Sequence, residues 1–150
     1  MTLNKNKLNK FLMLKLPSAW LCGVRVSEIE EDTCKVGVKY KWINQNPFNS
    51  MYFAVQAMAA ELSTGALVMG KIKQSNRKIS MLVAQNRATF TKKATGKINF
   101  YCYDGHLIDE AIEKTLATGE GQTLWMKSTG INDTGEQVAV FEFEWTIKAK

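Results

Sequence analysis

The sequence is short of the residues on which several classes of catalytic site depend. It holds one histidine, His106, and three cysteines without C-x-x-C spacing. Zinc sites need clusters of ligands that this chain lacks, and no G-x-S-x-G stretch is present to carry a serine nucleophile. The glycines of "TGEGQT" fit neither a Walker nor a Rossmann phosphate loop. We therefore expect no metal, no bound cofactor and no triad that depends on histidine.

Long apolar runs and leader sequences are also missing. No stretch approaches eighteen uninterrupted apolar residues. The start, "MTLNKNKLNKFLMLKLPSAWLCG", is interrupted by Lys15, and Trp20 and Leu21 rather than small residues precede Cys22. An odd number of cysteines fits reduced thiols better than a disulfide framework. These features predict a cytoplasmic protein with no membrane partner.

What is present is the composition of one globular domain. The chain has 150 residues, of which 45% are hydrophobic and 23% charged, and it shows no internal repeat or low-complexity linker. Its net charge of +6 would favour a polyanionic partner. Small clusters at Arg77–Lys78 and Lys92–Lys93 could serve nucleic acid, a phosphate-bearing ligand or solubility alone. Because the charge is scattered and no aromatic and basic platform accompanies it, we expect no nucleic-acid partner.

Hydrophobic periodicity predicts an α+β domain over residues 1–150. Its centre is a long, mostly apolar helix over about 50–70, capped by Asn49 or Ser50. A helix that is apolar on most sides must be enclosed, so we expect a curved antiparallel sheet wrapped around it. The remaining predicted elements are an amphipathic helix over 3–15 closed by Pro17, a short helix in "HLIDEAIEKTLATG", and strands over 21–26, 33–41, 79–90, 96–103, 122–129 and 137–147.

A single acid interrupts the central helix. Within "NPFNSMYFAVQAMAAELSTGALVMGK", Glu61 has no charged residue within nine positions on either side. Either it reaches solvent or pairs with a lysine or arginine, or it acts on a ligand that enters beside small neighbours. Helical phase gives three stripes: bulky residues expected to face the sheet (Met51, Val55, Met58, Leu62, Met69), weakly polar residues expected to face away from it (Tyr52, Gln56, Ser63), and mostly small residues around Glu61 (Ser50, Ala54, Ala57, Thr64, Gly65, Val68).

This order of elements, with an acid in the middle of the central helix, resembles the hot-dog fold of the thioesterase superfamily over about residues 20–148. The stretch "NPFNSMYFAVQAMAAELSTG" is similar to the helix region of a thioesterase-like branch whose members mostly have no assigned activity. In active relatives a His-Gly-Gly motif opens the helix about two turns before an Asp or Glu. Those three positions hold Tyr52, Phe53 and Ala54 here. The acid is kept, whereas the glycine that would leave backbone N–H groups open is not.

The resemblance implies hydrolysis of an acyl thioester, usually of coenzyme A. Glu61 would then be the base or nucleophile, while the amide of Ala54, helped by Asn49 or Tyr52, polarises the thioester carbonyl at the helix N-terminus. Asn46 is a further candidate for positioning the substrate. Both asparagines also suit plain turn and capping roles. A non-catalytic protein that holds a fatty acyl chain or acyl-CoA is the rival interpretation.

The resemblance also implies a homodimer, or a tetramer, whose sheets pair edge to edge. Active sites in such dimers lie between one subunit's helix and the other's strands. The strand "ISMLVAQNRATF", apolar on both faces for much of its length, suits a central position in the joined sheet. Arg87, Lys92 and Lys93, with Lys97 close by, would meet coenzyme A phosphates, or else are solvated strand residues. Dehydration by this fold needs a histidine beside the acid, and His106 lies outside the helix region.

Overall fold

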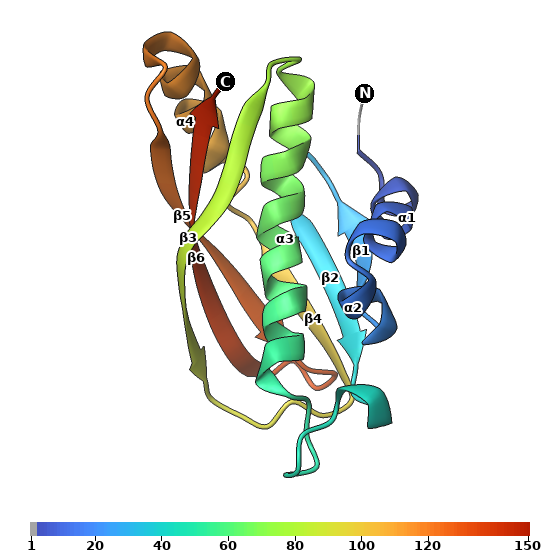
Figure 1. Cartoon of the computed structure of the whole chain (residues 1–150). Coiled ribbons are helices and arrows are strands. Elements are labelled where there is room, and N and C mark those ends of the chain that lie inside the picture. The colour runs from blue at the N-terminus through green and yellow to red at the C-terminus, as the bar shows by residue number, and fades with distance from the viewer. Residues whose placement is uncertain (1–2) are drawn as a thin grey trace.

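A computed structural model describes residues 3–150 and shows one antiparallel sheet curved around a long central helix (Figure 1). The strands lie in the order β1-β2-β4-β5-β6-β3, so that β3 forms one free edge and β1 the other. The predicted α+β class and the wrapped central helix are confirmed. The strands are β1 (Arg25–Ile29), β2 (Cys34–Lys39), β3 (Ile79–Phe90), β4 (Lys97–Cys102), β5 (Gln122–Ile131) and β6 (Gln137–Ala149).

The central helix starts and ends later than predicted. It is α3 (Phe53–Gln74), and its N-cap is Tyr52, whose side chain makes no capping hydrogen bond. Asn49 cannot cap it because its backbone is in the left-handed region, with φ 58°, and belongs to the preceding turn. The Ser50 hydroxyl bonds to the Asn46 side chain instead. The other helical segments are α1 (Lys5–Lys15), α2 (Pro17–Leu21), the 3₁₀ turn η1 (Trp42–Asn44) and α4 (His106–Thr118).

Pro17 begins a helix as well as ending one. It lies in the first turn of α2, where its missing N–H is not needed, so the first strand begins at Arg25 rather than near residue 21. α1 is fixed to β1 by Asn9, whose side chain accepts a hydrogen bond from Val26 N (2.8 Å) and donates one to Val26 O (2.9 Å). Leu8 and Leu12 are buried beneath it. α1 is thereby held close to the central helix.

Two of the three residues in the weakly polar stripe of α3 are buried, which corrects the predicted orientation, while Tyr52 is 47% exposed. Gln56 is 4% exposed, and Ser63 is fully buried with its hydroxyl oxygen 2.7 Å from that of Ser128 on β5. The Ser63 hydroxyl has Ser128 as its partner, and Gln56 Nε2 donates to Met51 O at 3.3 Å, so polarity alone was a poor guide to the solvent side. Bulky Met58 and Met69, expected against the sheet, are only partly buried.

One side of α3 is left open by the chain itself. Ala54, Ala57, Met58 and Glu61 are all partly exposed. In Figure 1, α3 lies in front of the sheet, and no other described helix or strand covers its near side. By length and composition alone α3 could cross a membrane, but 61% of its most apolar window is buried inside this domain. It is the core helix of the fold, with one open stripe.

Candidate active site on the central helix

Glu61 faces a small pocket between α3, α1 and β3. The pocket has a volume of about 200 Å³, and Phe11, Leu16 and Met81 contribute to its apolar walls. Lys15 also lines it, yet among residues 3–150 no basic side chain lies within 4.0 Å of the Glu61 carboxylate. The acid thus adjoins a cavity and has no ion-pair partner in the described chain. Of the two interpretations of Glu61, this geometry favours a group open to a ligand.

Gly65 leaves room for the Glu61 side chain. A Cβ added at Gly65 would lie 3.1 Å from Glu61 Oε1 and 3.1 Å from Cζ2 of Trp145. Trp145 is itself fixed, since its Nε1 donates a hydrogen bond of 2.9 Å to Thr64 Oγ1, which donates to the carbonyl oxygen of Glu61 at 2.9 Å. The carboxylate therefore lies over a glycine and beside an anchored indole ring.

These surroundings change the acidity of Glu61. Burial in apolar surroundings raises the pKa of its carboxyl group, because removing water disfavours the charged form and no cation offsets that loss. A raised pKa makes the carboxylate a stronger base than an exposed glutamate, and titratable groups perturbed in this way cluster at functional sites.

The N-terminus of α3 offers free backbone donors. The N–H of Val55 bonds to Tyr52 O at 3.0 Å, whereas the N–H groups of Phe53 and Ala54 have no acceptor within residues 3–150. Ala54 lies on the same face as Glu61, about 10 Å away along the axis. Within one chain the Glu61 pocket and the pocket beside the start of α3 are separate, because they share no lining residue.

A second pocket of about 470 Å³ lies beside the start of α3 and brings four of the predicted site residues together. Asn46, Tyr52, Lys92 and Lys93 all line it, together with Phe53 and Phe90, while Ala54 and Asn49 do not. The ring of Phe53 is 56% exposed and packs edge to face against Tyr52 and Phe90, with ring centroids 5.1 and 6.3 Å apart. An aromatic side chain thus occupies a position where the resemblance to active thioesterases predicts glycine.

Asn46 organises the loop before α3. Its Oδ1 accepts hydrogen bonds from Phe48 N at 2.8 Å and Ser50 N at 3.3 Å, and its Nδ2 donates to the Ser50 hydroxyl at 2.9 Å and to Met51 O at 3.3 Å. These hydrogen bonds stabilise the turn before α3, which is a sufficient structural reason for an asparagine at this position.

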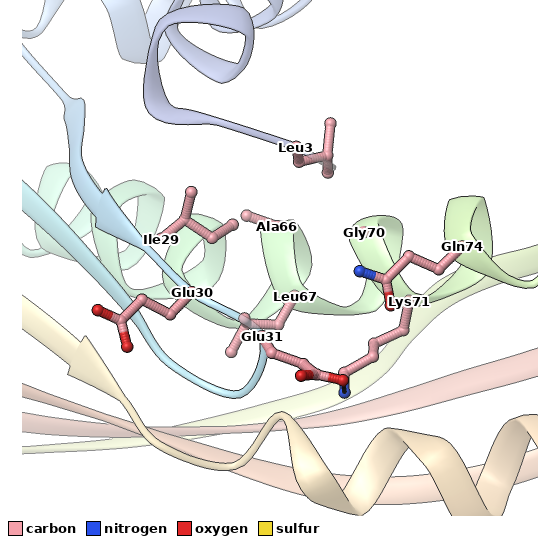
Figure 2. A pocket seen from close by; sticks show the side chains of 9 residues that line it. All are labelled: Leu3, Ile29, Glu30, Glu31, Ala66, Leu67, Gly70, Lys71 and Gln74. Atoms are coloured by element: carbon pink, nitrogen blue, oxygen red, sulfur yellow. Dashed lines mark ion pairs between the residues drawn. The ribbon is translucent and has the colours of Figure 1, made fainter. Parts of the chain in front are cut away.

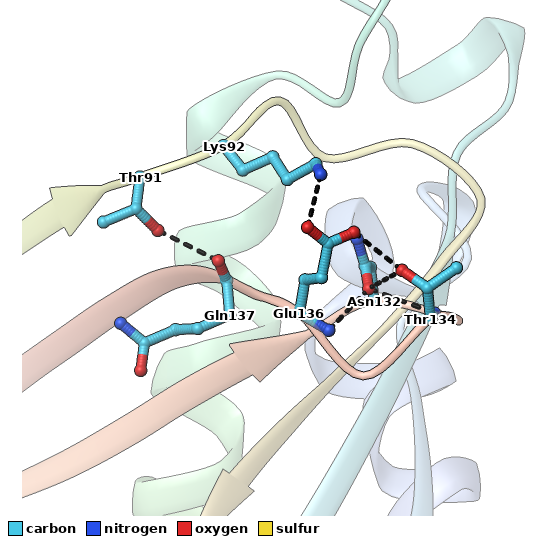
Figure 3. Close-up of polar contacts among 6 residues, drawn as sticks. All are labelled: Thr91, Lys92, Asn132, Thr134, Glu136 and Gln137. Atoms are coloured by element: carbon cyan, nitrogen blue, oxygen red, sulfur yellow. Dashed lines mark hydrogen bonds and ion pairs between the residues drawn. The ribbon is translucent and has the colours of Figure 1, made fainter.

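All three cations predicted to bind phosphate have a partner within the chain, and two of them form ion pairs. Arg87 forms a two-point contact with Glu142 at 3.1 Å and lies over the ring of Trp125. Lys92 pairs with Glu136 at 2.6 Å in a network that includes the β5–β6 turn, as Figure 3 shows. Lys93 Nζ donates to the carbonyl oxygen of Phe48 at 3.2 Å.

Lys71 is a buried cation that sequence reasoning missed. Its side chain is 5% exposed and lies 2.9 Å from Asp32, 3.1 Å from Asp109 and 3.9 Å from Glu31. Figure 2 shows its amine beside Glu31 at the edge of a further pocket. Burial lowers the pKa of the Lys71 amine, but its hydrogen bonds to Asp32 and Asp109 outweigh this and raise it. The cluster fastens α3 to α4 and to the β1–β2 turn, which is a structural role.

The comparisons with known proteins agree with this fold. A family model described as a domain of unknown function (DUF4442) matches residues 4–147. No curated protein matches the sequence. Residues 3–150 contain no group of three or more His, Cys, Asp or Glu side chains placed to hold a metal ion.

Solved structures extend the likeness over nearly the whole chain. A Pseudomonas aeruginosa protein of unknown function, described as a probable thioesterase, is similar with a TM-score of 0.85 and 21% identity, covering 100% of this chain and 99% of its own. A Chlorobaculum tepidum protein of unknown function gives 0.84 and 15%, covering 99% of each chain. A thioesterase from Haemophilus influenzae gives 0.76 and 12%, covering 99% of this chain and 93% of its own. The predicted hot-dog fold is therefore confirmed, and at these identities the likeness extends to the fold alone.

Proposed function

We propose that this chain, which belongs to the DUF4442 family of domains of unknown function, hydrolyses acyl thioesters such as acyl-CoA with Glu61 as general base. The observation that carries the proposal is the unpaired carboxylate beside a pocket with mostly apolar walls. A charge in such a place costs stability unless a partner offsets it. Catalysis gives a reason for keeping it there.

The proposed chemistry uses two groups on α3, the Glu61 carboxylate and the free backbone N–H groups at the helix N-terminus. Glu61 takes a proton from a water molecule as the water oxygen attacks the thioester carbonyl carbon. The negative charge that forms on the carbonyl oxygen is stabilised by free N–H groups and the partial positive charge at an α3 N-terminus, where Phe53 and Ala54 supply donors. Collapse of the intermediate breaks the C–S bond, the proton held by Glu61 passes to the leaving sulfur, and a thiol and a carboxylic acid are released with Glu61 ionised again.

A homodimer would unite these two ends. Met81, near the start of β3, lines the Glu61 pocket, and Phe90, at the end of β3, lines the pocket at the α3 N-terminus. Two free β3 edges paired antiparallel would set the start of one strand against the end of the other. The Glu61 pocket of one subunit would then adjoin the α3 N-terminal pocket of its partner. The free edge and the exposed Leu82, at 66%, support this assembly.

The catalytic proposal is tested by hydrolysis of acyl-CoA substrates of graded chain length. Glu61→Gln should lower kcat by at least about 100-fold, which is the usual contribution of a general base. Glu113→Gln is a matched control, because Glu113 is an exposed acid on α4 with no ion pair in the described chain. Equal rates in wild type and Glu61→Gln would remove Glu61 from the mechanism.

The dimer has a test of its own. Leu82→Lys places like charges on the free edge of both subunits and should yield monomers in light scattering after size exclusion. If the site spans two subunits, these monomers lose hydrolysis although Glu61 is unchanged. Monomers with full activity would show that one chain holds the complete site.

The rival candidate is a binding protein without turnover. The aromatic side chain of Phe53 favours it, because the ring replaces the small residue that active relatives carry beside the donor amides. Saturable binding of acyl-CoA by wild-type protein, with no release of thiol over many hours, would select this rival.

A further inference from the structure

A groove runs between α1 and the C-terminal half of α3. It has a volume of about 500 Å³, and its walls include Leu8, Phe11 and Ile72. Phe11 and Met69 line both this groove and the Glu61 pocket, so that the two hollows adjoin. We call the larger hollow the α1–α3 groove; Figure 1 shows α1 and α3, the two helices that line it.

The α1–α3 groove continues along α3 into the Glu61 pocket, and α1 follows α3 in the opposite direction. Lys15 of α1 lies at the Glu61 end, and Lys7 lies with Lys73 at the other. From Glu61 to Lys73 the helix rises about 18 Å. An apolar trough of this length suits an extended alkyl chain.

The far end of the groove is positively charged. Lys7, Lys73 and Arg77 line it, and no acidic residue does. Within residues 3–150 none of these three cations forms an ion pair. The other end is lined by one acid, Glu61, and one base, Lys15, instead of three cations. A ligand with one anionic end would therefore place that end at the three cations.

We infer that the α1–α3 groove binds a long-chain fatty acid, with its carboxylate at Lys7, Lys73 and Arg77 and its chain directed toward Glu61. The inference does not require Glu61 to be catalytic. Fatty acids are products of the hydrolysis proposed above. A fatty acid bound here would fill the space beside Glu61 and inhibit that hydrolysis.

The ligand chemistry is tested by equilibrium displacement of a fluorescent fatty acid, without any thioester. Palmitate should bind at least about tenfold more tightly than octanoate, since its longer chain buries more apolar surface. It should also bind about tenfold more tightly than uncharged hexadecanol, and added salt should reduce this difference. Equal binding of palmitate and hexadecanol would refute a role for the cations.

The position of the ligand is tested by matched variants. Lys7→Gln combined with Lys73→Gln should weaken palmitate binding about tenfold, whereas Lys10→Gln, an exposed lysine of α1 outside the groove lining, should not. Met69→Trp should fill the junction of the two hollows and weaken palmitate more than octanoate. Equal losses in the Lys7→Gln/Lys73→Gln double variant and in Lys10→Gln, or unchanged palmitate binding by Met69→Trp, would place the ligand elsewhere.

Discussion

The carboxylate of Glu61 and the missing side chain of Gly65 occupy neighbouring positions one turn apart on α3. A Cβ at Gly65 would lie 3.1 Å from Glu61 Oε1, which is closer than most contacts of this kind. The glycine therefore sets where the carboxylate can lie. It also lets the edge of Trp145 approach the helix closely.

Gly65→Ala should lower the rate of hydrolysis while leaving the unfolding free energy almost unchanged. Alanine gains up to about 1 kcal/mol of helix propensity, and crowding of Glu61 and Trp145 offsets part of this, so unfolding free energy should change by less than about 1 kcal/mol. Hydrolysis should fall about tenfold because the carboxylate is displaced. Gly70→Ala, whose new Cβ would meet only the flexible Leu3 side chain at 3.2 Å, is the control. Full activity in Gly65→Ala would show that the carboxylate position is not critical.

Glu61→Gln should stabilise the protein at neutral pH by about 0.5–2 kcal/mol, as is common when an unfavourable functional group is removed. The pKa of Glu61 is higher in the folded than in the unfolded protein. Below the unfolded pKa of about 4.3 the group is protonated in both states and does not destabilise the fold. As pH rises through the folded pKa it ionises, and the stability of the protonated form is lost. The gain in the variant should thus vanish in acid and grow with pH. Urea unfolding at several pH values measures it; a variant less stable at pH 7 would reveal an ion pair on Glu61.

Lys71→Met should destabilise the fold by about 1–3 kcal/mol, since two half-exposed aspartates lose their cation. The folded pKa of Lys71 is raised, so its contribution is fully present below the unfolded pKa of about 10.4 and is lost as pH rises through the folded value. The gap between wild type and variant should narrow at strongly alkaline pH. Lys73→Met, which removes an exposed lysine, is the control in thermal unfolding, and equal losses in both would exclude the cluster as the cause.

The three thiols should react very differently in the folded protein. Burial raises the pKa of Cys34 and of Cys102 to about 12, which leaves about one in ten thousand as thiolate at pH 8. Cys22 is only partly buried. Alkylation followed by intact mass measurement should therefore add one label to native protein and three in denaturant. Rapid labelling of Cys34 in native protein would mean that the β2 and β4 strands separate easily.

The order of strands and helices could be predicted because alternating and helical hydrophobic patterns are local. The inner row of β6, which includes Phe141, Phe143 and Trp145, is buried as its alternation predicts. Contacts distant in sequence left no such pattern. Ser63 could be placed against the sheet only by knowing that Ser128, 65 positions away, would meet its hydroxyl.

Part of the candidate site could be predicted because helical phase is also a local pattern. Helical phase and isolation identified Glu61 and the small residues beside it. The place of α1 could not be predicted, because the periodicity of α1 does not say which helix it packs beside. Phe11 and Leu16 were therefore unforeseen walls of the Glu61 pocket. Lys71 was missed because its acidic partners come from a turn and from another helix.

The position of α1 has a consequence for local unfolding. Its eleven residues are too few to stay helical alone, and two buried leucines and the two bonds of Asn9 fasten it. Detaching α1 exposes less apolar surface than opening the sheet, so its amide hydrogens should exchange with solvent earlier than those of α3. Each such excursion removes one wall of the Glu61 pocket while the sheet stays closed. A fluctuation at the N-terminal end of the chain thus controls how often the acid meets bulk water.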